Sequence, residues 1–185
     1  MHAHRFFESD EERRKWQNPE IILGSIGLKR GYTFIDVGCG NGFFALPAAR
    51  IVGKNGRVYG VDIDTEAIAI LKKKVSNAGL RNVELKAGAA EKTILCKACG
   101  DIVFFGIDLH DFDDPAKVLL NAKRMLKPTG RLVDLDWKKE SMNIGPPLQI
   151  RFDEEKATSL ILAAGFRIES IREVGSYHYM VVATL

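Results

Sequence analysis

The sequence predicts one α/β domain with an open, mostly parallel sheet that carries helices on both faces. Three observations support this prediction. Strand-like and helix-like segments alternate through residues 31–164. The first strand runs directly into a glycine-rich loop and then into a helix, which is the arrangement of a nucleotide-binding crevice. The chain closes with two strands joined by a short turn at residues 175–176.

Length and composition are typical of a single soluble unit. The 185 residues fit one domain over residues 1–185. Within it we expect helices over residues 1–30 that cover the site and a core over residues 31–185. The net charge of +3 is too small to indicate nucleic acid. With no apolar run of ~18 residues and no signal-like N-terminus, the sequence predicts a cytoplasmic protein without a membrane span.

The cysteines indicate neither a metal site nor a disulfide framework. There are three of them, an odd number, which fits a reducing compartment. Cys96 and Cys99 form a CxxC pair in a lysine-rich loop. A zinc site needs about four ligands, and no second pair accompanies this one. We therefore expect free loop thiols and no bound metal.

A strand, an acid and three glycines form the central motif of the chain, at residues 34–43. Residues 32–37 are mostly β-branched or aromatic and predict a buried strand. Without Cβ atoms, glycines let the backbone turn tightly and let a ligand approach the main chain. We expect a ligand-binding loop there. Its residues are Asp36, Gly38, Cys39, Gly40, Asn41 and Gly42.

The motif differs from the dinucleotide fingerprint at one position. The pattern GxGxxG would place its third glycine where this chain has Phe43. Asp36 lies two residues before the first glycine, where a carboxylate would meet a cationic ligand. S-adenosylmethionine carries an ammonium and a sulfonium but no phosphate. The motif therefore suits S-adenosylmethionine better than NAD.

Two helices are expected before this strand. Ser9 and Glu12 form a capping box for a helix that ends near Trp16. Asn18 and Pro19 begin the second helix. Its buried face is expected at Ile21, Ile22, Leu23 and Ile26.

The later elements follow from their periodicity and end signals. Asp64, Asp114 and Asp153 are expected to cap three of the helices. Helices are expected at residues 43–52, 65–77, 116–126 and 154–164, and strands at residues 57–62, 83–87, 101–105, 126–137, 167–174 and 177–184. Asp62 ends the second strand about twenty residues after Gly42, the spacing at which a carboxylate meets ribose hydroxyls in such folds.

These features resemble the class I S-adenosylmethionine-dependent methyltransferases. Asp36 and the GxGxG loop are similar to the family's first motif, and residues 107–115 to its fourth. Residues 126–132, Leu-Lys-Pro-Thr-Gly-Arg-Leu, resemble a strand entry of the small-molecule enzymes. The resemblance covers residues 16–185. It implies a Rossmann-like, doubly wound seven-stranded sheet in the order 3-2-1-4-5-7-6, with an antiparallel last strand, and S-adenosylmethionine as cofactor.

The resemblance also implies roles for individual residues. Ile63 would form an apolar wall for the adenine. Residues 88–91 stand where the family often has Gly-Asp-Ala, but Ala89 replaces the acid. Ala89, Ala90 and Glu91 would then hold the adenine through the backbone, through Glu91 or by packing. Gly106, after the fourth strand, would complete the cofactor site.

The sequence does not require a catalytic base. Methyl transfer depends mainly on alignment of donor and acceptor, and a base is needed only if the acceptor is protonated. His110 is the best candidate because the pKa range of histidine suits proton transfer near neutrality. Asp108 is the second, and Asp111 and His178 are further ones. A packing or capping role for His110 remains an equal alternative.

The methyl acceptor and the methylated atom cannot be read from the sequence. We expect a small-molecule acceptor or an exposed group of a larger one, and a homo-oligomer is left open. One rival function is an NAD(P)-binding oxidoreductase, which Asp36, Phe43 and the closing hairpin disfavour. The other is a subunit or sensor that binds the cofactor and transfers nothing. Transfer of another group from a related sulfonium is a third alternative.

Overall fold

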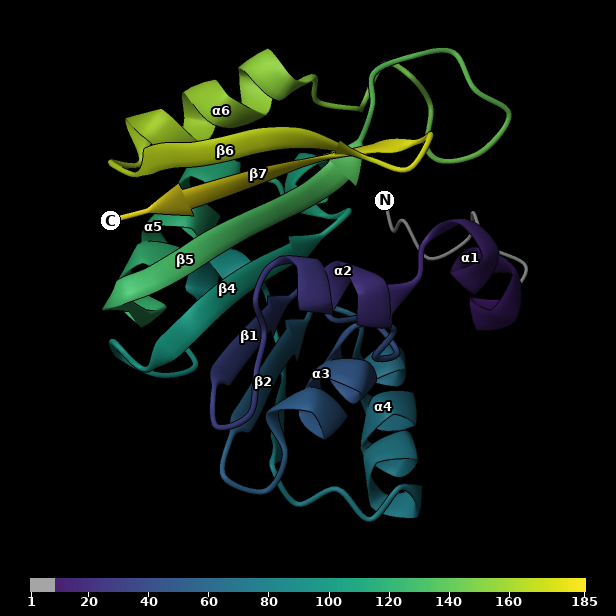
Figure 1. The fold of residues 1–185 in the computed structure, drawn as a ribbon, viewed down its shortest axis with the longest axis vertical. Helices are drawn as coiled ribbons and strands as arrows, with labels where there is room; N and C mark the ends of the chain where they lie inside the picture. The colour runs from purple at the N-terminus through teal and green to yellow at the C-terminus, as the bar shows by residue number, and fades with distance from the viewer. Residues whose placement is uncertain (1–8) are drawn as a thin grey trace.

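The structure, a computed structural model, describes residues 9–185; the start of the predicted N-terminal segment, residues 1–8, lies outside it. The strands of the described chain form one sheet in the order β3-β2-β1-β4-β5-β7-β6 (Figure 1). Neighbouring strands are parallel except that β7 runs antiparallel to β5 and β6. This confirms the predicted order. The strands are β1 Thr33–Val37, β2 Arg57–Asp62, β3 Val83–Ala87, β4 Gly100–Gly106, β5 Leu126–Trp137, β6 Arg167–Val174 and β7 His178–Thr184.

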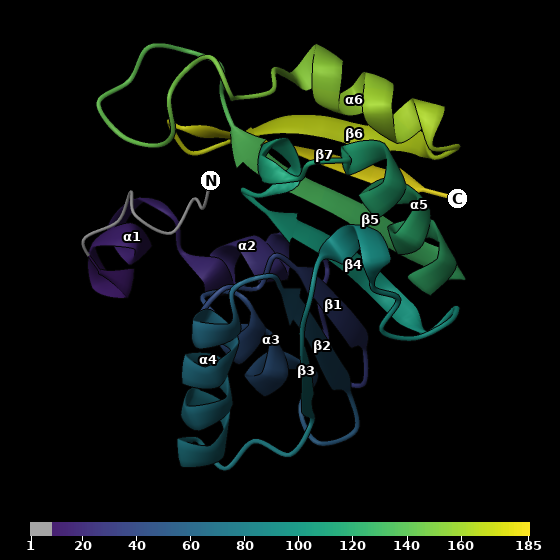
Figure 2. The same ribbon diagram turned by 180° about the vertical axis from the view of Figure 1, so that it is seen from behind.

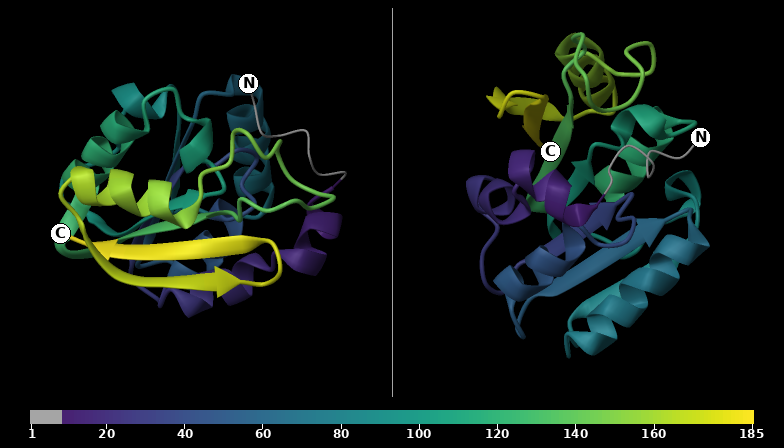
Figure 3. Two further views of the ribbon diagram at one scale, coloured as in Figure 1. Left: turned by 90° about the horizontal axis from the view of Figure 1, so that it is seen from above. Right: turned by 90° about the vertical axis from the view of Figure 1, so that its right-hand side faces the viewer.

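Helices cover both faces of the sheet, and each face has its own apolar core. The helices α2, α3 and α4 lie on one face, and α5 and α6 lie on the other (Figures 1 and 2). The short helix α1 projects beside the sheet at the end that carries the glycine loop (Figure 3). The helices are α1 Asp10–Trp16, α2 Pro19–Ser25, α3 Ala45–Val52, α4 Thr65–Asn77, α5 Pro115–Met125 and α6 Glu154–Ala163, with 3₁₀ turns η2 Ala90–Lys92 and η3 Leu109–Asp111.

The predicted caps are confirmed, and they explain why the helix starts could be read from sequence. The Ser9 hydroxyl accepts a hydrogen bond from the Glu12 backbone N–H at 3.2 Å. Asn18 caps α2 through the N–H of Ile21 at 3.0 Å. The three predicted aspartate caps accept from the first turns of α4, α5 and α6 in the same way. Each cap satisfies N–H groups that have no partner within the helix.

Several boundary and burial predictions are wrong. The helix α3 begins at Ala45 instead of residue 43, because the glycine loop continues through Phe44. Ile21 is 70% exposed, since α2 is short and presents only one side to the core. The last strand begins at His178, so Tyr177 belongs to the turn before it.

The expectation of free thiols at Cys96 and Cys99 is also wrong, because these two residues form a disulfide. Their loop is fixed by backbone hydrogen bonds from Ala98 to the Arg124 carbonyl and from Cys99 to the Met125 carbonyl, at 3.0 Å each. The tight turn, with Ala98 at a φ of 45°, places the two Cα atoms 6.0 Å apart. Sequence spacing alone cannot show this turn.

The sheet order brings the glycine loop and the segment after β4 together. The parallel strands β1 and β4 are neighbours, with Val37 beside Phe105. Their connections leave in opposite directions, so their carboxyl ends open a crevice at the point where strand order reverses. The loop after β1 and the turn η3 therefore share one end of the sheet.

One buried acid lies outside this crevice. Asp134 on β5 is fully buried, and neither carboxylate oxygen has a hydrogen-bond partner among the described residues. Burial raises its pKa well above the usual range, and the charge of Asp136 adds to the effect. The folded protein therefore keeps a proton on Asp134 that the unfolded chain loses above a pKa of about 3.9.

Stability should consequently fall as pH rises from about 4 toward the raised pKa of Asp134, because the unfolded state then binds fewer protons than the folded state. Asp134→Asn should flatten this slope in urea unfolding measured at about pH 5 and about pH 8. At about pH 8 the free energy of unfolding of Asp134→Asn should exceed that of wild type by on the order of 1–3 kcal/mol, which is the cost of an unsatisfied buried polar group. The exposed Asp113→Asn change is the control. Parallel curves for wild type and Asp134→Asn would contradict the prediction.

Candidate functional site

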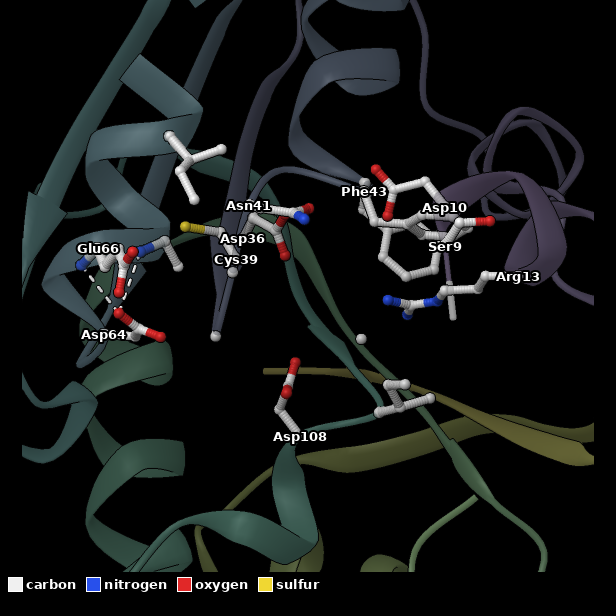
Figure 4. A pocket seen from close by; sticks show the side chains of 17 residues that line it. Ser9, Asp10, Arg13, Asp36, Cys39, Asn41, Phe43, Asp64, Glu66 and Asp108 are labelled. Atoms are coloured by element: carbon white, nitrogen blue, oxygen red, sulfur yellow. Dashed lines mark hydrogen bonds between the residues drawn. The ribbon is translucent and has the colours of Figure 1, made fainter. Parts of the chain in front are cut away.

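A pocket of about 450 Å³ opens at the carboxyl ends of β1 and β4. The glycine loop, the first turns of α4, the residues after β4 and one side of α1 line it (Figure 4). It brings together seven of the predicted site residues: Asp36, Gly38, Cys39, Gly40, Asn41, Gly106 and Asp108. The other predicted residues do not line this pocket: Gly42, Asp62, Ile63, Ala89, Ala90, Glu91 and His110.

Two of the glycines are needed for packing within the protein. Gly38 has a φ of 79°, and a Cβ on it would lie 2.8 Å from the Asp108 carboxyl group. Gly42 has a φ of 96°, and a Cβ there would overlap the side chain of Leu71 on α4. Gly38 thus lets an acid lie against the loop. Gly42 lets α4 approach it, so Gly42 acts at a distance from the pocket and not as a lining residue.

Asp36 is a buried acid with spare hydrogen-bonding capacity. It is 2% exposed, and its Oδ2 atom has no hydrogen-bond partner among the described residues. Burial raises its pKa to about 7, with a further contribution from the charge of Asp62, while Arg13 opposes the shift. A buried carboxylate oxygen without a donor fits a ligand that brings its own cationic donor.

Asp108 adds a second acid, and the backbone before it is strained. Burial raises the pKa of Asp108 well above its usual range, and the charges of Asp62 and Asp36 raise it further. Ile107 has a φ of 71°, which is a genuine outlier for a β-branched residue. Its N–H donates to the Leu135 carbonyl at 2.6 Å, which helps to hold this conformation. Such strain is typical of functional sites.

Arg13 of α1 is a site residue that the sequence analysis did not identify. It lines the pocket, and its guanidinium carbon lies 3.9 Å from the centre of the Phe43 ring. Its Nε donates to the Gln17 side chain at 2.6 Å. Burial lowers its pKa to about 10, although Asp108, Asp10 and Asp36 act in the opposite direction. The capping box at Ser9 predicted the helix but not the side of it that faces the pocket.

Asp62 supports the loop from the next strand. Its Oδ2 accepts from the Gly40 N–H at 2.7 Å, and its Oδ1 accepts from the Asp64 N–H at 2.8 Å. Ile63, next to it, is 57% exposed. The Asn121 side chain donates to the carbonyls of Ala90 and Glu91 at 3.0 Å each and fixes the turn η2. These residues extend the site from the pocket toward β3.

His110 lies beside the pocket, in a buried pair with Asp136. Its Nδ1 lies 2.7 and 2.9 Å from the two Asp136 oxygens and donates to that carboxylate. Its Nε2 has no hydrogen-bond partner among the described residues and lies 3.5 Å from Asp111. Burial lowers the pKa of His110, but Asp136 and then Asp111 raise it, and the net direction is upward. Asp136 is another residue that the sequence analysis did not single out.

His178 lies in an aromatic cluster instead. Its ring stacks on Trp16 at 5.5 Å and lies 4.4 Å from the Trp137 ring. Burial lowers its pKa to about 3, and Arg13 and Arg151 contribute to the shift. A histidine that stays neutral and packs between two tryptophans anchors α1 to β7, and it does not line the pocket.

A buried arginine organises the loop after β5. Arg151 is 4% exposed and lies 5.5 Å from the Trp137 ring. Its guanidinium donates to four backbone carbonyls of this loop. They belong to Pro146 at 2.8 Å, Ile144 at 2.9 Å, Lys138 at 3.1 Å and Glu140 at 3.2 Å. The loop is therefore held in one shape at the same end of the sheet as the pocket.

The sheet order and the pocket together define the class I methyltransferase fold with a nucleoside-type cofactor site. A family model described as a methyltransferase domain matches residues 28–165. The chain therefore belongs to the methyltransferase-domain family. Its sheet order places it with the class I methyltransferases.

Individual proteins agree with this assignment. The crystal structure of a SAM-dependent methyltransferase from Aquifex aeolicus is 35% identical, with a TM-score of 0.88 over 92% of this chain and 91% of that one. Demethylmenaquinone methyltransferases from Bacillus velezensis and Bacillus cytotoxicus are 28% and 30% identical over 72% of this chain. The chain spans 57% and 56% of those two proteins.

The described part of the chain has neither a membrane-spanning helix nor a cluster of metal-binding side chains. No helix within residues 9–185 is long and apolar enough to cross a membrane. Over the same range, no three or more histidine, cysteine, aspartate or glutamate side chains come together to hold a metal ion.

Gly38→Ala should be much more damaging than Gly27→Ala, although both glycines have a φ near 80°. Each change costs about 1–2 kcal/mol because alanine is strained in the left-handed region. Only at Gly38 would the Cβ also meet Asp108, whereas nothing lies within 4 Å of the position at Gly27. The free energy of unfolding measured in urea and the affinity for the cofactor should therefore both be lower in Gly38→Ala than in Gly27→Ala. Equal losses in the two variants would show that the Asp108 contact is unimportant.

Proposed function

We propose that this chain transfers a methyl group from S-adenosylmethionine to a small-molecule acceptor, at the pocket between β1, β4 and α1. The observation that carries the proposal is the unpartnered Oδ2 of Asp36, buried beside the glycine loop. A carboxylate in this position attracts a cationic ligand and repels a pyrophosphate. Arg13, on the opposite wall of the pocket, supplies the one complementary charge that an amino-acid ligand also needs.

The pocket residues match the two ends of the cofactor. Asp36 would accept from its ammonium group, and Arg13 would pair with its carboxylate. Asp62 would accept from the ribose hydroxyls, because a carboxylate that receives two N–H bonds still has lone pairs to offer. The middle of the ligand would contact the backbone of the glycine loop, at Gly38, Cys39, Gly40 and Asn41. Gly106, at the end of β4, would complete this part of the site. Ile63, Ala89, Ala90 and Glu91 would border the adenine.

Alignment is the main contribution of this protein to the reaction. When bound, the cofactor supplies a methyl group on a sulfonium that leaves as a neutral thioether. The rigid strand tips and the loop clamped by Arg151 would hold donor and acceptor in line, which can be worth about 7–11 kcal/mol of effective concentration. Asp108, beside Gly38, would face the positive end of the donor.

His110 is proposed as the base for an acceptor that must lose a proton. Asp136 orients its ring so that Nδ1 keeps its hydrogen and Nε2 carries the free lone pair. The acceptor would reach Nε2 by displacing the Asp111 carboxylate, which lies 3.5 Å away. The raised pKa of His110 implies that its base form predominates only at a higher pH than for an ordinary histidine.

The acceptor is proposed only as a small molecule, and the oligomeric state remains a prediction. Because the Bacillus relatives are named for demethylmenaquinone, a quinol belongs in the first acceptor screen, together with phenols, amines and thiols. Incorporation of radiolabel from the cofactor is the readout. Cofactor binding without transfer to any fraction of cell extract would favour the rival function of a sensor or subunit.

S-adenosylhomocysteine should raise the melting temperature, and NAD or NADP should not. A ligand that binds only the folded state stabilises it by about 2.7 kcal/mol at a hundred times its Kd, so the shift should reach several degrees. A shift with NAD but none with S-adenosylhomocysteine would support the oxidoreductase instead.

The contribution of Arg13 can be isolated within the same assay. 5′-Methylthioadenosine has the nucleoside and sulfur but lacks the amino-acid end. Arg13→Gln should weaken S-adenosylhomocysteine about tenfold or more, since it removes a charge-assisted pair, and should leave methylthioadenosine nearly unchanged. A loss of equal size for both ligands would mean that Arg13 does not bind the carboxylate.

The His110–Asp136 pair predicts different titrations for two buried histidines. By NMR, the pKa of His110 should lie above its ordinary value and should fall in Asp136→Asn, because that change removes the neighbouring charge. His178 should stay neutral from about pH 5 to about pH 9 in both proteins and serves as the internal control. An unchanged His110 titration in Asp136→Asn would contradict the proposed pair.

A further inference from the structure

The edge of the sheet opposite the cofactor pocket is strongly basic. The segments that lead into the parallel strands or form their first residues carry lysines and arginines but no aspartate or glutamate. These segments are residues 27–32, 53–57, 79–82, 96–100, 127–131 and 165–167. The carboxyl ends of the strands carry acids instead, including Asp36, Asp62 and Asp108. Although the net charge is only +3, the two edges of the sheet carry charges of opposite sign.

A cavity of about 430 Å³ opens in the basic edge, between the end of α3 and the segment before β3. Arg50, Lys54 and Arg81 line it, together with the apolar side chains of Ala49 and Leu80, and no acidic residue lines it. A smaller hollow of about 120 Å³ also involves Lys54 and adds Arg30. The cationic groups come from three segments of the chain, and Lys54 lines both hollows.

Two other cations of this edge have acidic partners. Arg57 pairs with Glu84 at 2.8 Å, and Lys127 pairs with Asp101 at 2.7 Å. Within residues 9–185, no acidic side chain forms an ion pair with the four residues that border the two hollows. They are Arg30, Arg50, Lys54 and Arg81.

The negative end of the helix α3 does not account for this cluster. Cations near a helix C-terminus are stabilising because they face unsatisfied carbonyls. Here the Asn82 side chain already donates to the carbonyls of Ala49 and Gly53, at 2.9 and 3.0 Å. Asn82 thus adds a second donor to two carbonyls beside the cavity, each of which also accepts a backbone N–H.

We propose that this cavity binds a small molecule that carries linked phosphate groups. Guanidinium groups bind phosphate oxygens through paired hydrogen bonds. The volume lies within the range of about 300–1,000 Å³ that is usual for small-molecule sites, and it exceeds what a single phosphate fills. Leu80, which is half-buried, offers an apolar contact to the rest of the ligand. The acidic cofactor pocket does not suit the same ligand, and the two pockets share no lining residue.

The test is a titration of the full chain with inorganic tripolyphosphate, followed by calorimetry and by NMR of the backbone amides. We expect one saturable site, with shifts at Gly53 and Gly79 and none at Gly38 or Gly40. S-adenosylhomocysteine should not compete. Absence of saturable binding, or shifts confined to the glycine loop, would overturn the proposal.

Matched variants separate a built site from general attraction. Arg50→Gln with Arg81→Gln should weaken tripolyphosphate about tenfold or more. Lys72→Gln with Lys73→Gln removes the same charge from the exposed face of α4 and should change the affinity less than about twofold. Equal weakening in both pairs would overturn the proposal. Unchanged binding of S-adenosylhomocysteine in both variants shows that they are folded.

Discussion

The cofactor site depends on acids that are buried before any ligand neutralises them. Asp36 and Asp108 lie at the tips of adjacent strands, where burial and the charge of Asp62 raise both pKa values. Arg13 is the basic residue that lines the same pocket. A protein that only had to be stable would not keep such a cluster, because unpaired buried charge is costly. Binding of a cationic ligand beside these acids would offset the free-energy cost of burying them.

The fold explains how these groups reach one place. Parallel pairing of β1 with β4 puts the two strand tips side by side, and the glycine at position 38 lets Asp108 lie against the loop. Ile107 adopts a strained backbone just before Asp108, where the chain turns from the pocket toward β5. The segment thereby presents one acid to the cofactor side and pairs His110 with Asp136 on the other. Packing, strain and charge placement thus arise from one stretch of chain.

Much of the fold could be read from the sequence because local rules agree with the tertiary structure. Capping residues predicted the starts of α1, α2, α4 and α6 and placed the start of α5 one residue too late, and strand composition located β2 and β3 to the residue. The sheet order came from family resemblance. Ile21 and the Cys96–Cys99 pair were misjudged because burial and turn geometry depend on neighbours distant in sequence.

The site was only partly readable for the same reason. The glycine loop, Asp36 and Asp108 have a sequence pattern, and the pocket contains them. No sequence pattern marks Arg13 as a site residue. A seven-residue helix without buried residues has no apolar periodicity from which the side that faces the pocket could be predicted. Asp136 did have a sequence signal, because it is one of two acids in the second half of β5, residues 132–137, which is otherwise apolar. Its pairing with His110 still required the register of β5 against β4.

The most direct test of the central claim is the proton balance of cofactor binding. Calorimetry of S-adenosylhomocysteine binding near pH 6.5, in two buffers with different ionisation enthalpies, measures it. Asp36 has a pKa of about 7 without ligand, so an ammonium that binds the ionised form should release a large fraction of a proton, and affinity should rise with pH. Asp36→Asn should remove most of this release. Proton uptake, or equal release in wild type and Asp36→Asn, would contradict the account.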